Sequence, residues 1–445
     1  MDLNIRIPSI VKEICHKFKS RGYQAFIVGG TIRDALLQRE NPDYDIATDA
    51  MPEEILSIFP HAIPYGNFGT VLLMVESIKI EITPFRNDAP GRKPRYSFGG
   101  TIYTDLARRD FTINSMAYDP ISSEFIDPFG GLQDLKSRVI RCTGNTRRIW
   151  EDPLRALRAA RFQAQLGFTI EPSSLYALKA HAHLLDTISR ERIRDELLKL
   201  ITSDHPFDGL VTLVVTGLMK HVIPELLEGM GMHHNNKPND VLEHNLLACK
   251  YVKNSPHLRL AALLHDVGKP RCAVEKEGIL EFPGHHTKSL EMAKAILKNL
   301  RFDNYTVNKV LLLIEHHMFI YAPDTPLSEA RRLISKVGWE NIYDLIELRK
   351  ADRLASGFEE AVGPGLKKLI SDLEELKKEK SDYQIKDLDI SGKDLIDELG
   401  IPPGPLVGRL LKVLLDNVIE NPELNRREIL LEVAKKHLEG GSLCE

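Results

Sequence analysis

The first third of the chain alternates short apolar runs with polar turn segments. Four runs are rich in β-branched and aromatic residues, which favour strands: YQAFIVGG (23–30), YDIAT (44–48), TVLLMV (70–75) and IKIEITPF (78–85). Before them, the stretch 1–22 mixes charged and apolar residues in an amphipathic helical pattern. This part of the sequence predicts a small mixed α/β domain.

Helical periodicity replaces the strand signals from Glu151 onward and dominates the rest of the chain. Pro206, the loop MGMHHNNKPND (230–240) and AVGPG (361–365) interrupt this periodicity, and a charged helical stretch follows at 366–380. The fold class that we expect is therefore α+β, with a small mixed-sheet domain followed by an all-helical remainder.

Length and composition narrow the class of protein. A chain of 445 residues is too long for one compact core, so about three domains are expected. No segment approaches the roughly 20 apolar residues of a membrane span, and the N-terminus lacks the apolar core of a signal peptide, so a cytoplasmic protein is expected.

The net charge of −4 means that any nucleic-acid binding must come from local basic faces. The five scattered cysteines include no CxxC pair, which argues against a disulfide framework and a thiolate zinc site.

Candidate chemistry begins at the stretch PDYDIATDA, where Asp43 and Asp45 lie two positions apart on a predicted strand. Alternate residues of a strand share one face, so the two carboxylates converge, whereas a lone Asp-x-Asp is more often a solvated turn. Just upstream, FIVGGTIRDALL predicts a strand, a Gly29-Gly30 turn and the start of a helix, which would present backbone N–H groups to an anion. Arg33 on that helix could reach the same phosphates.

Paired aspartates beside a phosphate-binding turn indicate a site for divalent cations, which take oxygen ligands and bridge triphosphate oxygens. The implied chemistry is metal-dependent nucleotidyl transfer. A third carboxylate is expected, and Glu81 in IKIEITPFR is a candidate because it shares a strand face with Lys79 and Thr83. An exposed strand residue is the alternative interpretation of Glu81.

Seven motifs in order resemble those of the class II tRNA nucleotidyltransferases, which rebuild the CCA end of tRNA and have bacterial poly(A) polymerases as close relatives. The motifs are VGGTIRD, PDYDIAT, GTV followed by EITPFR, DLARRDFTINSMAYD, DPFGGLQDL, EDPLRALRAARF and SRERIRDEL, over roughly the first 200 residues. The resemblance implies a polymerase-β-like nucleotidyltransferase head in which Asp43 and Asp45 bind magnesium. It also implies that Gly30, Arg33 and Arg109 lie at the bound nucleotide, and that Asp110 lies close to the active centre and is a second candidate for the third carboxylate.

The segment EDPLRALRAAR predicts how the base is chosen. Pro153 suits a first helical turn, and Asp152, Arg155, Arg158 and Arg161 follow at i+3 steps along one face. Cytosine and adenine each present an amine donor beside a ring-nitrogen acceptor, so Asp152 accepting and Arg155 donating would favour CTP and ATP over UTP and GTP. The family assigns this role to the positions that match Asp152 and Arg155. Arg158 and Arg161 would serve phosphates or RNA, the alternative being a surface helix with i,i+3 ion pairs.

The segment between Phe85 and Arg108 is several residues shorter than the flexible loop of this family. In the family that loop helps the pocket to switch from C to A, and its shortening is a feature of members that add only CC. Addition of CC alone is therefore an alternative to full CCA addition.

A separate set of histidines and aspartates occupies the helical middle of the chain. His244, His265-Asp266 and Asp352, with histidine pairs at 285–286 and 316–317, resemble the HD phosphohydrolase superfamily over roughly 240–360. We expect His244, His265, Asp266 and Asp352 to bind a transition metal or magnesium. His286 and His317 are further candidates, although His285 or His316 could take either place. An active site here would cleave a phosphate ester at an RNA end, and the alternative is a domain that only holds RNA.

The C-terminal region resembles the end of HD-containing tRNA nucleotidyltransferases. Several cations there could contact tRNA phosphates or simply be solvated, namely Lys393, Arg409, Lys412, Arg426 and Arg427. The resemblance implies a head at 1–145, a helical neck with base recognition at 146–205, an HD-type domain at 206–362 and a tRNA-binding region at 363–445.

The favoured function is template-independent addition of C, C and A from CTP and ATP to the 3′ end of tRNA, with release of pyrophosphate. The alternatives are a CC-only-adding enzyme, a poly(A) polymerase and, in a different class, a metal-dependent HD phosphohydrolase with an RNA-binding head. The oligomeric state is not determined by the sequence.

Overall fold

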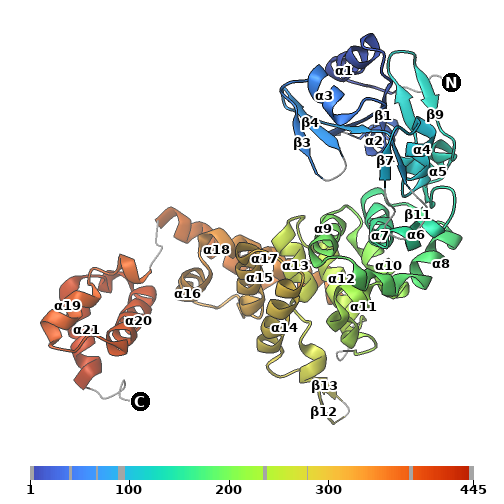
Figure 1. Cartoon of the computed structure of the whole chain (residues 1–445). Coiled ribbons are helices and arrows are strands. Elements are labelled where there is room, and N and C mark those ends of the chain that lie inside the picture. The colour runs from blue at the N-terminus through green and yellow to red at the C-terminus, as the bar shows by residue number, and fades with distance from the viewer. Residues whose placement is uncertain are drawn as a thin grey trace. The chain divides into compact units, whose positions relative to one another are not determined.

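The computed structural model describes residues 5–39, 43–66, 69–88, 96–233, 238–277, 279–379 and 384–439. The chain forms two compact units, Met1–Glu228 with Asn299–Phe302, and Gly229–Lys298 with Asp303–Glu445 (Figure 1). None of the helices in the described part of the chain has the length and apolar character that a bilayer crossing requires.

A seven-stranded mixed sheet forms the centre of the first unit, in the order β3-β4-β5-β2-β1-β8-β9. Its strands are β1 (Ala25–Val28), β2 (Asp43–Thr48), β3 (Ile63–Tyr65), β4 (Thr70–Val75), β5 (Ile78–Pro84), β8 (Ala117–Asp119) and β9 (Glu124–Ile126). β2 and β5 run parallel, and their register places Asp43 opposite Lys79 and Asp45 opposite Glu81. The other neighbouring pairs are antiparallel. The four strand runs expected from the sequence are thus confirmed as β1, β2, β4 and β5.

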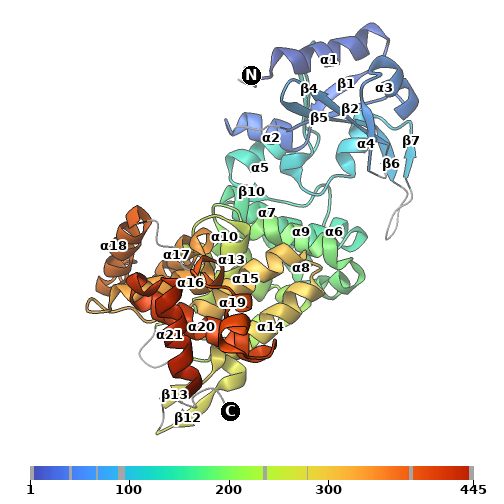
Figure 2. The same cartoon turned by 90° about the vertical axis from the view of Figure 1, so that its left-hand side faces the viewer.

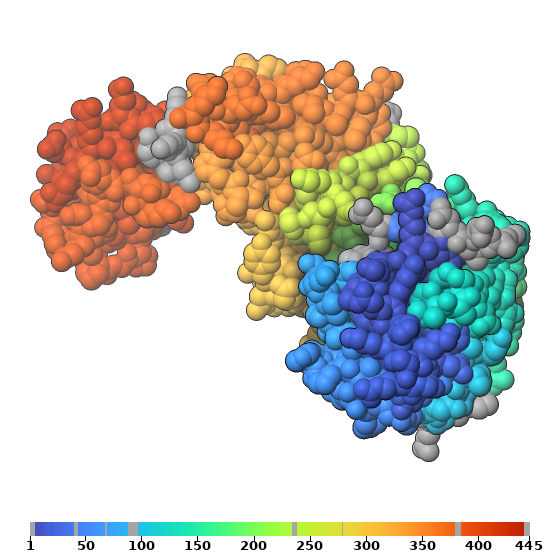
Figure 3. Space-filling model, turned by 90° about the horizontal axis from the view of Figure 1, so that it is seen from above, coloured from blue at the N-terminus to red at the C-terminus, as the bar shows by residue number. Residues whose placement is uncertain are grey.

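Helices cover both faces of this sheet (Figure 2). They are α1 (Ser9–Ser20), α2 (Gly30–Leu36), α3 (Pro52–Ile58), α4 (Ile102–Ala107) and α5 (Gly131–Lys136). Ile27 of β1 packs in one core with Phe18 of α1, whereas Phe26 of β1 packs in a second core with Leu106 of α4. Alternate side chains of a strand point to opposite faces. Because both faces of β1 are covered, every β1 residue is buried. In the space-filling view, residues of the N-terminal helix (dark blue) lie at the surface turned to the viewer (Figure 3).

The rest of the first unit is helical apart from short strands. Its helices are α6 (Arg147–Glu151), α7 (Leu154–Leu166), α8 (Pro172–Ala180), α9 (Arg190–Ile201), α10 (Pro206–Val215) and α11 (Met219–Val222), with 3₁₀ turns at Thr112–Asn114, Ala182–Thr187 and Pro224–Gly229. The short strands are β6 (Arg86–Asp88) paired with β7 (Tyr96–Phe98), and β10 (Val139–Ile140) paired in parallel with β11 (Thr169–Ile170). The central helix α7 packs against α9 and α10, which buries the alanines of its apolar face.

The second unit is also mainly helical. Its helices are α12 (Val241–Tyr251), α13 (Pro256–Leu264), α14 (His285–Asn299), α15 (Asn304–His316), α16 (Leu327–Val337), α17 (Trp339–Ala355), α18 (Pro364–Glu379), α19 (Gly392–Leu399), α20 (Pro405–Glu420) and α21 (Arg427–Glu439), with 3₁₀ turns at Lys269–Cys272, Ile385–Asp387 and Pro422–Leu424. The antiparallel pair β12 (Val274–Lys276) and β13 (Ile279–Glu281) departs from the all-helical expectation, as β11 does in the first unit. The expected α+β class is confirmed.

Candidate active site

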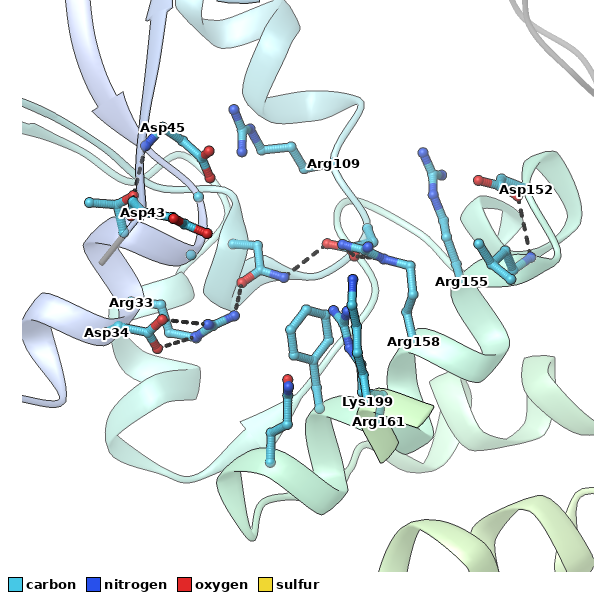
Figure 4. Close-up of a pocket in the computed structure, with 18 of the residues that line it drawn as sticks. Arg33, Asp34, Asp43, Asp45, Arg109, Asp152, Arg155, Arg158, Arg161 and Lys199 are labelled. Atoms are coloured by element: carbon cyan, nitrogen blue, oxygen red, sulfur yellow. Dashed lines mark hydrogen bonds and ion pairs between the residues drawn. The ribbon is translucent and has the colours of Figure 1, made fainter. Parts of the chain in front are cut away.

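A charged cavity of about 670 Å³ opens in the first unit, where residues of the sheet domain face helices α7 and α9. Its volume lies in the range of small-molecule sites. Every residue that we expected at the nucleotide from the sequence of this unit lines it, namely Gly29, Gly30, Arg33, Asp43, Asp45, Arg109, Asp110, Asp152, Arg155, Arg158 and Arg161. In the close-up, Asp43 and Asp45 lie on one side, Asp152 and Arg155 on the other, and Arg109 between them (Figure 4).

The Gly29-Gly30 turn brings backbone and two charged side chains very close together. Gly29 has φ +68° and ψ −134°, a conformation that an L side chain rarely adopts. A Cβ added to Gly29 would lie 2.6 Å from Nη1 of Arg109 and 3.5 Å from Oδ2 of Asp45. The backbone conformation therefore favours glycine here, and a side chain would also have to displace the Arg109 guanidinium.

An acidic corner is formed where β2 and β5 run side by side. The register sets Glu81 next to Asp45, and both line the cavity with Asp43. Burial raises the pKa of Asp45 to about 6, and the neighbouring Glu81 and Asp43 raise it while Arg109 lowers it. Thr31 fixes the strand to the start of α2, because its Oγ1 accepts from the Asp45 backbone N–H at 2.9 Å.

The donor set of this corner fits a divalent cation. It offers carboxylate oxygens on adjacent strands, which are the ligands that magnesium and calcium prefer. Arg109 and Lys79 are cations that lower the pKa of Asp45, and Lys79 is held by Glu81 at 2.6 Å (Nζ to Oε1). A bound cation would offset the repulsion that Glu81 and Asp43 exert on Asp45.

Arg109 is oriented by a carboxylate that our sequence reasoning missed. Asp105 of α4 is fully buried, and its Oδ2 lies 2.9 Å from Nη2 of Arg109. The other oxygen of Asp105 binds Nη2 of Arg108 at 2.5 Å. Asp105 precedes these arginines by three and four residues, a helical spacing typical of ion pairs, so this signal was present in the sequence.

Asp110 connects the sheet domain to helix α7. Its Oδ2 accepts from Nε of Arg158 at 2.7 Å, and its Oδ1 accepts from the Asn114 amide at 3.0 Å. Asn114 in turn accepts from Nη1 of Arg33 at 2.8 Å. Burial disfavours the carboxylate, yet Arg158 and Asn114 hold the pKa of Asp110 well below its usual range. Asp110 is thus engaged with arginine and amide donors, whereas Glu81 lies beside the aspartate pair.

The two residues expected to read the base lie at the junction of α6 and α7. Asp152 ends α6 with an extended backbone, so it precedes the helix rather than lying on it, and its Oδ1 accepts from the Leu154 backbone N–H at 3.3 Å. Arg155 donates from Nη2 to the Arg108 carbonyl at 2.8 Å and from Nη1 to the Arg148 carbonyl at 3.1 Å. The Arg155 guanidinium is therefore held by backbone carbonyls of two different segments.

Farther along α7, Arg158 and Arg161 share a buried carboxylate that the sequence reasoning also missed. Glu196 of α9 lies 3.3 Å from Arg161 (Oε2 to Nη1) and 3.7 Å from Arg158 (Oε1 to Nη1). Arg161 stacks over Phe162 with 4.2 Å between guanidinium carbon and ring centroid, and burial together with Arg158 lowers its pKa to about 10. The i,i+3 ion pairs of the alternative interpretation are not what holds these two arginines.

The second unit brings together the other set of residues expected from the sequence. The histidine cluster consists of His244, His265, Asp266, His285, His317 and Asp352. His244 Nε2 lies 3.3 Å from Asp266 Oδ2 and 3.3 Å from Asp352 Oδ1, and 3.1 Å from His265 Nε2. His244, His265 and Asp266 offer ligand atoms within 4.8 Å of one another, as do Asp266, His285 and His317.

The structure also resolves the two open positions in this set. His285, and not His286, faces Asp266, with 3.4 Å between Nε2 and Oδ1, and His317, and not His316, lies 3.8 Å from the same oxygen. Burial lowers the pKa of His317 to about 4 and also lowers that of His285. Their Nδ1 atoms lie 2.7–2.8 Å from backbone carbonyls, which leaves each Nε2 directed at the cluster without a hydrogen-bond partner. Neutral imidazoles with one free nitrogen fit a metal site.

Among the cations expected at tRNA, Arg427 of α21 is held within the tail. Its Nη2 lies 3.2 Å from Asp394 Oδ1 and 3.1 Å from Glu398 Oε1, both on α19. The contact of these tail cations with tRNA stays a prediction.

Family models match three parts of the chain. The model described as "Poly A polymerase head domain" matches residues 25–141, and "Probable RNA and SrmB- binding site of polymerase A" matches residues 167–230. A third, described as a tRNA nucleotidyltransferase domain 2, matches residues 275–434. The first match covers β2 and β5, which carry the acidic corner.

Similar proteins align over nearly the whole chain. The CCA-adding enzyme of Lactococcus lactis subsp. cremoris (strain MG1363) is 33% identical, with 96% of both chains covered. That of Limosilactobacillus reuteri (strain DSM 20016) is 30% identical, with 96% of this chain and 97% of the relative covered. The crystal structure of the Bacillus stearothermophilus CCA-adding enzyme in complex with CTP is 29% identical, covers 97% of each chain and has a TM-score of 0.74. The chain therefore belongs to the family of the CCA-adding enzymes.

Proposed function

We propose that the protein adds C, C and A, one nucleotide at a time, from CTP and ATP to the 3′ end of tRNA, with release of pyrophosphate. The observation that carries this proposal is that a single cavity combines the acidic corner on β2 and β5 with the Asp152–Arg155 pair. One group of residues suits triphosphate chemistry and the other suits a choice between bases. Membership of the CCA-adding family supports the same function.

For the chemical step, Asp43 and Asp45 would hold the divalent cation, magnesium in our proposal, with Glu81 as the third carboxylate. The cation, when bound, would activate the tRNA 3′ hydroxyl and stabilise the pyrophosphate that leaves. Arg109, held by Asp105, and Arg33 would bind phosphate oxygens through charge-assisted hydrogen bonds. Gly29 leaves the space in which Arg109 and Asp45 approach the turn.

For base selection, Asp152 would accept a hydrogen bond from the exocyclic amine, and Arg155 would donate to the ring nitrogen of cytosine or adenine. Two backbone carbonyls hold Arg155, so its remaining N–H groups keep a fixed direction without help from an RNA template. Uracil and guanine would set a carbonyl against the Asp152 carboxylate, and such a mismatch costs about 1 to 3 kcal/mol when buried. Asp110 would act by holding Arg158 rather than by touching the cation.

Addition of CC alone and poly(A) synthesis are the alternatives within the same class. Part of the shortened segment, residues 89–95, lies outside the described residues, so the loop argument for CC-only addition rests on the sequence.

A direct test uses tRNA transcripts that end at the discriminator base, at C and at CC, incubated with magnesium and either CTP or ATP. We expect two additions of C to the first, one addition of C to the second and one addition of A to the third. A CC-ended transcript that accepts no A would establish CC-only addition, and continued growth with ATP would establish a poly(A) polymerase.

A second activity is favoured by the histidine cluster. Two neutral imidazoles with free Nε2 atoms converge on Asp266, and Lys269 forms an ion pair with the same carboxylate. We propose that this cluster binds a divalent metal ion and supports hydrolysis of a phosphate ester at an RNA end.

Metal binding is tested by measuring the metal content of the protein after equilibration with Mn²⁺ and removal of excess ion. His265→Ala should lose one bound metal per chain, whereas His286→Ala, one residue from the cluster, should retain it. Equal metal content in both variants would contradict the proposal.

A further inference from the structure

Helix α9 forms a wall of the nucleotide cavity with three charged residues on one face. Arg192, Glu196 and Lys199 follow at i, i+4 and i+7, which places them on one side of the helix. Arg192 and Lys199 line the cavity, and Glu196 between them holds Arg158 and Arg161. The end of α9 that carries Arg192 therefore lies beside the residues that read the base.

Arg192 approaches Asp152 directly. Its Nη2 lies 3.4 Å from Oδ2 of Asp152, while Oδ1 of Asp152 accepts from the Leu154 backbone N–H at 3.3 Å. Each carboxylate oxygen thus has a donor from a different helix. The side chain of Asp152 is 34% exposed and that of Arg192 is 53% exposed, so this ion pair lies at the rim of the cavity and not in the core.

The two residues of the reading pair differ in how many backbone groups hold them. Arg155 donates to two backbone carbonyls, which do not move when a side chain is replaced, and its Nη1 also lies 3.6 Å from Oε2 of Glu151. Asp152 depends on a side chain, Arg192, for one of its two oxygens. A carboxylate rotates over a broad range about χ2, so a donor at Oδ2 restricts which lone pairs face the cavity.

We infer that Arg192 is a positioning residue that sets base specificity through Asp152; this inference rests on the base-reading role proposed above. By holding Oδ2, Arg192 keeps the carboxylate turned so that it accepts from an exocyclic amine and opposes a base carbonyl. Without Arg192 the carboxylate turns toward solvent, which weakens both the bond to cytosine or adenine and the repulsion of uracil or guanine. Discrimination between amine-bearing and carbonyl-bearing bases therefore falls.

The test measures equilibrium affinity for CTP and UTP by calorimetry, with magnesium and without tRNA, so that no turnover contributes. For Arg192→Ala we expect the ratio of CTP to UTP affinity to fall about five- to tenfold, and for Arg192→Lys a smaller fall, because the ammonium can still donate to Oδ2. Arg194→Ala is the matched control, because Arg194 carries the same charge on the same helix but binds the Arg301 carbonyl and Asp195 instead. That variant should leave the ratio unchanged.

A double-mutant cycle with Asp152→Asn separates the possible outcomes. If Arg192 acts through Asp152, adding Arg192→Ala to Asp152→Asn changes the affinity ratio by less than about twofold. Full additivity would overturn the inference and indicate that Arg192 acts on the nucleotide independently of Asp152. An unchanged ratio in Arg192→Ala beside a reduced ratio in Asp152→Asn would overturn it and leave the base-reading proposal standing. An unchanged ratio in Asp152→Asn would overturn both.

Discussion

The charged side chains of the cavity are held in place by neighbouring buried residues. Gly29 combines a positive φ with a close approach of the Arg109 guanidinium. Asp105, Asn114 and Glu196 touch the residues expected at the nucleotide and hold their charged groups in place. At this scale the site is a set of charged groups that are oriented by other, buried polar groups.

Gly29→Ala should therefore weaken nucleotide binding in two ways, by straining the backbone at a positive φ and by displacing Arg109. The added Cβ would lie 2.6 Å from Nη1 of Arg109 and would displace that guanidinium from the turn. We expect at least tenfold weaker binding of CTP, and a loss of about 1 to 2 kcal/mol in the free energy of unfolding. Gly22→Ala is the control, because Gly22 also has a positive φ, +85°, but has open space around its Cβ position. Equal losses of CTP affinity in the two variants would show that the contact with Arg109 is unimportant.

The Asp110–Arg158 pair should contribute stability that depends on pH in a defined direction. Its surroundings depress the pKa of Asp110 below the ordinary 3.8, so the contribution is present above that value and is lost as the pH falls below it. We expect Asp110→Asn to lower the free energy of unfolding by about 2 kcal/mol between pH 5 and 8, and by progressively less below pH 4.

Urea unfolding at several pH values measures this difference. Asp195→Asn is the control, because Asp195 pairs with Arg194 at an exposed position. A deficit in Asp110→Asn that grows as the pH falls below 4 would have the wrong sign and would contradict the assignment.

At the scale of elements, strand register decides which carboxylates meet. The period-2 pattern of the sequence was enough to place Asp43 and Asp45 on one face and Glu81 opposite Ile80 and Ile82. It could not show that β2 pairs with β5, because pairing joins segments that are far apart in the chain. The sequence therefore left Glu81 and Asp110 as equal candidates for the third carboxylate, and the register sets Glu81 beside Asp45.

Elsewhere, too, local sequence patterns predicted nearby structure but not contacts between distant segments. Pro153 correctly predicted a helix start, yet Asp152 lies before that helix, at the junction with α6. The partners of Asp105 could have been predicted from their spacing, whereas Glu196 lies 35 residues beyond Arg161 and has no local signal. The choice of His285 over His286 depends on which side of α14 faces Asp266, and adjacent histidines do not reveal that in sequence.

The register predicts a specific role for Glu81. Glu81→Gln should slow nucleotide addition about tenfold or more and raise the magnesium concentration needed for half-maximal rate, because one oxygen ligand loses its charge. Glu124→Gln on the edge strand β9, an exposed position, is the control. The rate is measured against magnesium concentration with a CC-ended tRNA and ATP. An unchanged magnesium dependence in Glu81→Gln would favour a different third ligand.

At the scale of the whole molecule, the two compact units carry two separate groups of ionisable residues. Among the residues that the structure describes, those that line the nucleotide cavity belong to Met1–Glu228, and those of the histidine cluster belong to the second unit. A substitution in one group should therefore leave the chemistry of the other group intact.

This separation predicts independent loss of the two activities. Asp43→Ala should abolish nucleotide addition and leave hydrolysis of a 2′,3′-cyclic phosphate intact, whereas Asp266→Ala should do the reverse. Both activities are measured on the same preparations of full-length protein, with thermal unfolding to confirm that each variant is folded. Loss of both activities in a folded variant would show that the two sites do not act independently.

On the function that we propose, the cavity itself selects C and A, and addition ends after a complete CCA. The most direct measurement incubates a tRNA that lacks its CCA end with magnesium and all four nucleoside triphosphates, and then sequences the 3′ ends of the products. We expect a single product class that ends in CCA, with no added U or G and no extension beyond A. Products that carry U or G, that stop at CC, or that continue as a run of A would contradict it.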